Sequence, residues 1–160
     1  MTPILIAVLV CGLCPTPPLG ATMGIGNIQP VTQTIAVAGD SGGSGATVTQ
    51  LPATGWATYY GRGIFPGVVE RQIGWSNIQP DTCPDCLGYA AMLWPGDLDR
   101  IVCIVEGGRV SRLWVVDSAA GHHRQALIAD GWLIDLQRSV WDELGFWNAP
   151  TLVTVTECIS

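Results

Sequence analysis

Two apolar runs joined by a glycine turn constrain the fold of this chain most strongly. The first run, residues 100–105 (RIVCIV), is continuously apolar after its arginine, which is typical of a strand covered on both faces. Residues 106–109 (EGGR) follow, and glycine supplies the positive φ that a tight turn can need. The second run, residues 110–116 (VSRLWVV), has the composition of a returning strand. The sequence therefore predicts an antiparallel hairpin.

Other segments extend this mostly β pattern. Residues 55–61 (GWATYYG) and 151–158 (TLVTVTEC) are short runs rich in aromatic or β-branched residues. One short helix is expected near residues 136–144, with Asp135 as its N-cap and Gly145 as the left-handed residue after its end. A small closed barrel suits several strands and one helix best, because closure removes exposed strand edges.

The composition requires a folded core and limits the partners. Hydrophobic residues make up 48% of the 160 residues and charged residues 12%, so one folded domain is expected rather than a disordered chain. All 7 basic residues are Arg, against 13 acidic residues, which gives a net charge of −6. That balance argues against a nucleic-acid binder and against a polybasic membrane-surface protein.

The N-terminus has the pattern of an export signal. Residues 4–14 form an apolar run that ends at Pro15, and a helix of that length is shorter than the roughly 20 residues that cross a bilayer. Residues 1–21 are therefore predicted to be a cleaved signal peptide, although no Lys or Arg precedes the run. Two alternatives stay open: lipidation at Cys11, disfavoured by the bulky Val10, and a buried segment of the fold.

A linker and a single domain complete the expected organisation. Residues 22–54 are rich in Gly, Ser and Thr and carry Asp40 as their only charge, so they predict a flexible linker. The folded domain is expected over residues 55–160.

Four cysteines remain if the signal peptide is removed. In an exported chain, an even number favours disulfides, with the connectivity left open among Cys83, Cys86, Cys103 and Cys158. The CPDC motif at 83–86 could instead be half of a zinc site, but no second close pair exists. A redox CxxC would need a βαβ context, which the sequence does not predict. No metal ion or cofactor is expected.

The order of several short motifs resembles a known family. Residues 56–61 (WATYYG) are similar to the opening strand of double-psi β-barrels of the rare-lipoprotein-A-like and expansin/barwin group. Residues 90–97 (AAMLWPGD) resemble its alanine-rich strand and P-[FY]-G-T turn, and 115–117 (VVD) its V-x-D segment. Residues 134–145 resemble its I-D-L-S helix entry. The match covers about residues 55–155.

The resemblance implies a six-stranded double-psi barrel, exported and directed at cell-wall polysaccharide or peptidoglycan. The group includes lytic transglycosylases, glycoside hydrolases and non-lytic wall-loosening proteins, and its acidic positions correspond to Asp117 and Asp135. Met92 stands where the rare-lipoprotein-A motif has a His, and the segment between the two aspartates is longer than usual. The missing His favours a wall-binding module over a lytic enzyme.

Each candidate catalytic residue also has a structural interpretation. Asp117 could be a general acid at the barrel mouth or a turn residue that bonds backbone amides. Asp135 could share the catalysis or cap the helix. His122, near Asp117 and beside His123, could replace the missing His or lie in a solvated loop.

Aromatic residues are the expected glycan contacts, because sugar rings stack on exposed indole and phenol faces. The candidates are Tyr59, Tyr60, Trp94 and Trp132, while core packing is expected to use at least half of the turn-proximal tryptophans Trp56, Trp75, Trp94, Trp132 and Trp147. Three functions remain open: a wall-glycan binding or remodelling monomer, a lytic transglycosylase or glycoside hydrolase using Asp117 and Asp135, and a disulfide-stapled interaction protein without a glycan ligand.

Overall fold

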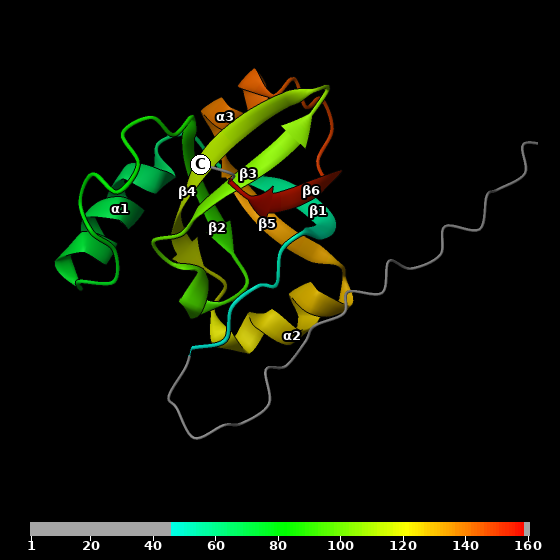
Figure 1. The fold of residues 1–160 in the computed structure, drawn as a ribbon. Helices are drawn as coiled ribbons and strands as arrows, with labels where there is room; N and C mark the ends of the chain where they lie inside the picture. The colour runs from blue at the N-terminus through cyan, green and yellow to red at the C-terminus, as the bar shows by residue number, and fades with distance from the viewer. Residues whose placement is uncertain (1–45, 159–160) are drawn as a thin grey trace, which may run out of the picture. The chain divides into compact units, whose positions relative to one another are not determined.

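The computed structural model describes residues 46–158, and the expected signal peptide lies outside them. Strands dominate this part of the chain, with three short α-helices and one 3₁₀ turn around them (Figure 1). The strands are β1 (Ala53–Tyr60), β2 (Gly88–Met92), β3 (Ile101–Glu106), β4 (Arg109–Ser118), β5 (Trp132–Gln137) and β6 (Thr151–Glu157). The helices are α1 (Ile64–Gly74), η1 (Pro95–Asp97), α2 (Gly121–Ala129) and α3 (Arg138–Glu143).

The six strands close into a barrel in the order β1-β5-β2-β4-β3-β6. The β1–β5 and β2–β4 pairs are parallel, and the other four pairs are antiparallel. Exchanging β1 with β4, β2 with β5 and β3 with β6 reproduces the same set of pairs, so the two halves of the barrel are related by a pseudo-two-fold arrangement. The expected mostly β, double-psi barrel fold is confirmed.

The predicted hairpin is β3 and β4. Gly107 and Gly108 make its turn with φ of 56° and 78°, which glycine adopts without steric cost. In β3, Val102 and Ile104 point into the barrel, and Cys103, between them, is also buried. Because β3 is covered on both faces at these positions, its sequence is apolar without alternating with polar residues. The returning strand is longer than expected and includes Asp117.

Two hydrophobic clusters lie on the two sides of the barrel wall. The interior is filled from all six strands, with Ala90 and Met92 of β2 completely buried in it. Ala91, between them, points outward into a second cluster with Phe65 and Val68 of α1. In Figure 1, α1 and the following loop cover this outer side near β2 and β4. This cover positions α1 over the candidate site.

The helices differ from the expectation of a single one. The helix C-terminal to Asp135 exists as α3 but begins only at Arg138, and Gly145 follows it with a φ of 74°, as expected. Asp135 is not its N-cap: that prediction is wrong, because Asp135 lies within β5, whose backbone is bonded to strands on both sides. α1 and α2 were not expected, since Gly and Pro within α1 obscured its apolar face.

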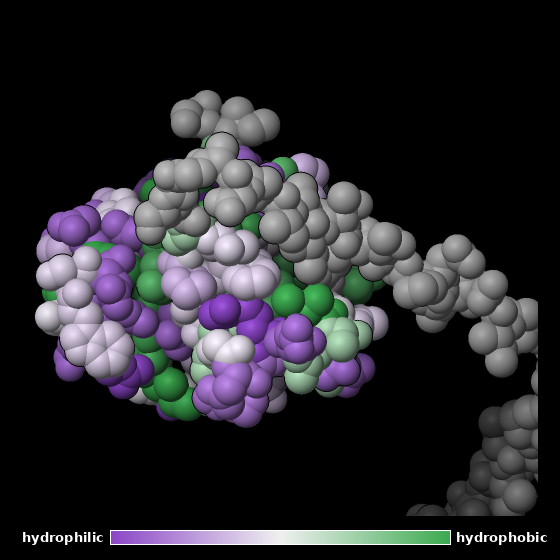
Figure 2. Space-filling model, turned by 90° about the horizontal axis from the view of Figure 1, so that it is seen from below, coloured by the Kyte–Doolittle hydropathy of each residue, from purple (hydrophilic) through white to green (hydrophobic). Residues whose placement is uncertain are grey.

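α2 is a solvated helix. None of its residues is buried, and Figure 2, viewed from the side on which α2 lies, shows hydrophilic residues across the middle of that face. His122 and His123 occupy its first turn and are exposed, with ring centroids 4.0 Å apart. The expected loop at these histidines is therefore a helix, although the expected solvent exposure is correct.

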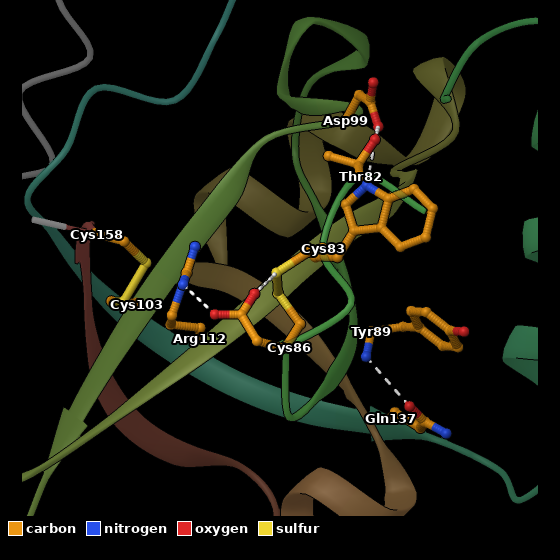
Figure 3. The surroundings of a disulfide bond; sticks show 11 residues. Thr82, Cys83, Cys86, Tyr89, Asp99, Cys103, Arg112, Gln137 and Cys158 are labelled. Atoms are coloured by element: carbon orange, nitrogen blue, oxygen red, sulfur yellow. Dashed lines mark hydrogen bonds and ion pairs between the residues drawn. A yellow bond between two sulfur atoms is a disulfide. The ribbon is translucent and has the colours of Figure 1, made fainter. Parts of the chain in front are cut away.

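Two disulfides staple the domain. Cys83 pairs with Cys86, and Cys103 pairs with Cys158, as Figure 3 shows. Because Cys83 and Cys86 are bonded to each other, the CPDC motif is a disulfide rather than half of a zinc site or a reduced dithiol. The second ties β3 to the residue after β6, across the antiparallel pair that these strands form.

The folded part begins earlier than the boundary expected at Gly55. β1 starts at Ala53, and Thr49 is buried against Asp97. A Cβ on Gly96 would lie 2.6 Å from the Thr47 carbonyl oxygen, so glycine is needed for this close approach. Residues 46–54 of the expected linker are thus part of the domain. No helix in residues 46–158 is long and apolar enough to cross a membrane.

Candidate functional site

Four residues form a row across the outer wall of the barrel, which we call the acidic row: Thr58, Asp135, Ala91 and Asp117. Thr58 is the register partner of Asp135, and Ala91 is the partner of both aspartates. Register partners on neighbouring strands point to the same face, and Ala91 packs outside the barrel. The two aspartates therefore share one outward face, with their Cα atoms roughly 10 Å apart across two strand spacings.

A β-bulge brings Asp117 to this face. Val115 pairs with Ala90 and Asp117 pairs with Ala91, so Val116 is an extra residue in β4. Simple alternation from Val115, which points inward, would turn Asp117 into the barrel interior. The bulge reverses that alternation. The other parallel pair, β1–β5, also carries a register shift: Trp56 pairs with Trp132 and Ala57 with Ile134, so the extra residue is in β5.

Asp135 is a carboxyl whose surroundings favour the protonated form. Its Oδ1 accepts hydrogen bonds from the Thr58 hydroxyl and, at 3.3 Å, from the Trp132 indole N–H. Burial raises the pKa of Asp135 from its ordinary 3.8 to about 6; the Trp132 hydrogen bond lowers it, and the negative charge of Asp117 raises it. Asp135 therefore holds a proton in mildly acidic solution and can release it near neutrality.

Asp117 is held by two neutral donors. The Tyr60 hydroxyl donates to Oδ2 at 3.3 Å, and the Gln72 side chain of α1 donates to Oδ1 at 3.3 Å. Burial, followed by the charges of Asp117 and Asp135, raises the pKa of Tyr60 above its ordinary value. Tyr60 therefore stays protonated and remains a donor to Asp117.

This arrangement separates the roles of two neighbouring carboxyls. A pair of titratable groups whose environments differ is the usual basis of acid and base assignments. Asp135 has the raised pKa expected of a general acid, and Asp117 lies close enough for its charge to affect Asp135. The site can donate a proton on one side and stabilise positive charge on the other.

The structure brings some of the predicted site residues together and separates others. Tyr60 and Trp132 contact the acidic row directly. Trp94 lies under the Arg124 guanidinium, 4.7 Å from the ring centroid, and Tyr59 packs against Trp141.

His122 does not join the acidic row. Within residues 46–158, no hydrogen bond or ion pair links His122 to either aspartate. Met92 is fully buried inside the barrel. No histidine therefore contacts the carboxyl pair.

Two residues of the site were missed from the sequence. Side chains of a strand alternate between its two faces, so a strand over residues 55–61 would place Thr58 on the same face as Tyr60, two residues later. Gln72 had no such signal, because it belongs to the unexpected helix α1. In the part of the chain that the structure describes, no group of His, Cys, Asp and Glu side chains is arranged to hold a metal ion.

Comparisons with models of known families, with curated proteins and with solved structures find no match to this chain.

Proposed function

We propose that this domain binds a cell-wall glycan beside the partly exposed carboxyls of the acidic row and that Asp135 protonates the glycosidic oxygen. The observation that carries the proposal is the raised pKa of Asp135, about 6, in a carboxyl that shares one face with Asp117. The motif order that resembles wall-directed double-psi barrels supports the choice of substrate.

The chemistry follows from the two environments. Cleavage of a glycosidic bond needs an acid at the leaving oxygen and stabilisation of an oxocarbenium-like transition state. Protonated Asp135 gives its proton to the leaving oxygen as the glycosidic bond breaks, and the Asp117 carboxylate stabilises the developing positive charge. A water molecule then attacks the anomeric carbon and returns a proton to Asp135. Trp56 lies two residues before Thr58 on the same face of β1 and is 40% exposed, so it offers a stacking surface for a sugar ring.

Export forms part of this proposal. Two disulfides in a domain of this size favour an oxidising compartment, in agreement with the predicted signal peptide over residues 1–21. We expect the mature protein to be a secreted or envelope-associated monomer. Mass spectrometry of the exported protein should find an N-terminus near Ala21 or Thr22, and a secreted form that retains Met1 would contradict export by cleavage.

The test of catalysis measures soluble muropeptides released from purified peptidoglycan. Asp135→Asn should lower the release rate by at least about 100-fold, the usual contribution of a general acid. Asp117→Asn should also lower it, while wall binding in a pull-down persists. Asp130→Asn is the matched control, because Asp130 is exposed at the end of α2. Unchanged release in both site variants would overturn the catalytic role.

A wall-binding function without cleavage is the second candidate. It is favoured by Gln72, which places α1 against Asp117, and by the absence of a histidine at the acidic row. In that case wild-type protein would bind peptidoglycan and release nothing. A protein that neither binds nor cleaves wall material would instead support an interaction protein without a glycan ligand.

A further inference from the structure

A pocket of about 360 Å³ opens beside the part of the acidic row that lies on β1 and β5. It lies where β1 and β5 finish, and it is lined by residues from the turn after β1, from the start of α1 and from the β5–α3 junction: Gly61, Arg62, Gly63, Phe65, Pro66, Gln137, Arg138, Ser139 and Asp142. Gln137 pairs with Tyr60, two residues further along than the Asp135–Thr58 pair. The pocket is thus roughly 7 Å along the strands from Asp135.

The charged groups in this pocket are two arginines and one aspartate. Among residues 46–158, Arg62, Arg138 and Asp142 are the ionisable residues that line it, so these residues give the pocket a local positive charge in a chain of net charge −6. The first turn of α1, which forms part of the wall, contains no acidic residue. A local excess of positive charge in an acidic protein favours an anionic ligand group.

The two arginines differ in how firmly they are held. Arg138 donates from Nε to Asp142 at 2.8 Å, and its guanidinium lies over the Tyr59 ring, 4.3 Å from the centroid. The ring and the carboxylate fix its orientation. The Arg62 side chain is 84% exposed and meets the other oxygen of Asp142 only at 3.3 Å. Arg62 can therefore turn toward a ligand at little cost, because exposed ion pairs contribute little.

We propose that this pocket binds a carboxylate group carried by a peptide substituent of the wall glycan. A guanidinium presents parallel N–H donors that match the two oxygens of a carboxylate. Arg138 supplies a fixed donor group and Arg62 a mobile one, so the ligand carboxylate competes with Asp142 for both. The pocket begins two register positions beyond Asp135, and a ligand that spans both sites is part of this proposal.

The identity of the ligand rests on the proposed function, whereas the carboxylate chemistry of the pocket does not. Two sources of the carboxylate are possible: the peptide stems of peptidoglycan or the free C-terminus of an unattached peptide. The experiment separates these sources with a small peptide probe and with two forms of the glycan.

The first arm uses acetyl-Ala-Ala as the free acid and as its C-terminal amide, with binding followed by NMR shifts of the arginine side chains. The acid should bind and the neutral amide should bind about tenfold more weakly, as expected for lost charge-assisted hydrogen bonds. Arg138→Gln and Arg62→Gln should each remove this preference. Arg109→Gln is the control, since Arg109 lies in the β3–β4 hairpin outside the pocket and is exposed. Equal binding of acid and amide would overturn the proposal.

The second arm compares peptidoglycan with glycan strands stripped of their peptide stems by an amidase. Wild-type protein should bind the intact material about tenfold more tightly, and Arg138→Gln should bind both forms equally. Equal wild-type binding to both forms would overturn the stem as the ligand. Failure to bind either glycan, with the acid preference of the probe intact, would contradict the proposed wall function but leave the carboxylate pocket. Thermal melting of each variant checks the fold, and the exposure of Arg62 makes its substitution the safer one.

Discussion

Two sites in this domain hold an aspartate in contrasting ways, one fully buried and one half-buried. Asp97, in η1, is completely buried and accepts hydrogen bonds from both the backbone N–H and the hydroxyl of Thr49, at 2.8 and 2.7 Å, and from the Trp94 N–H at 3.1 Å. The Arg100 guanidinium pairs with it at 2.7 Å. We call these four residues the Asp97 anchor, since they fasten the segment before β1 to the barrel.

The acidic row gives Asp135 fewer partners. Within the described part of the chain, its carboxyl has one hydroxyl donor and one indole donor, no arginine partner, and a second carboxyl on the same face. The comparison shows that burial alone does not define a functional acid. Asp97, with a cation and several donors, links two segments of the domain, whereas burial and then the nearby charge of Asp117 raise the pKa of Asp135.

The largest expected effect is at the Asp97 anchor. Asp97→Ala should lower the free energy of unfolding by about 3 kcal/mol, because it leaves the buried donors of Thr49 without an acceptor and removes one of the two carboxylates that pair with Arg100. Urea denaturation at pH 7 measures the change. Asp130→Ala should stay within about 0.5 kcal/mol of the wild type. Similar losses in the two variants would show that the anchor has no special role.

A smaller effect on the free energy of unfolding, and one that changes with pH, is expected for a substitution in the acidic row. The pKa of Asp135 is raised in the folded state to about 6 from 3.8. Its contribution to stability is therefore fully present below about pH 4 and is lost as the pH rises through 6. Asp135→Asn does not titrate, so its stability relative to the wild type should improve by about 2 kcal/mol between pH 4 and pH 7. Denaturation curves at several pH values test this, and a constant difference would contradict the raised pKa.

The smallest effect is expected at Tyr60. Tyr60→Phe keeps the ring contact with Phe65 and removes the hydrogen bond to Asp117. Because that bond is long, at 3.3 Å, a loss of about 1 kcal/mol is expected in thermal melts at pH 7. If Tyr60→Phe lowered the stability as much as Asp97→Ala, the Tyr60 hydroxyl would hold the fold together in the same way as the Asp97 anchor.

Local patterns in the sequence predict much of the barrel. The β3–β4 hairpin follows from two apolar runs and a Gly-Gly turn, and β1 and β6 follow from aromatic and β-branched composition. These signals are visible because strand propensity and turn chemistry act within a few residues. Asp117 and Asp135 could be predicted as site residues only from the order of the motifs. Tyr60 and Trp132 could be predicted only from their aromatic side chains.

Features that depend on neighbours distant in the sequence could not be predicted. Asp135 resembles a helix N-cap locally, but pairing with Thr58 and Ala91 places it in a strand. Arg138 and Arg62 are 76 positions apart, and their shared contact with Asp142 exists only in the folded chain.

The sequence by itself determined that this chain forms a small, mostly β domain with cysteines suited to disulfides, because hydrophobic pattern and turn residues act locally. The tertiary structure alone decided which way Asp117 points, because one bulge residue in β4 reverses the alternation of side chains. It also decided which buried aspartate is an anchor and which a candidate acid. Arg100, the cationic partner of Asp97, is only three residues away in sequence, whereas the burial that raises the pKa of Asp135 and the nearby charge of Asp117 come from strands distant in the sequence.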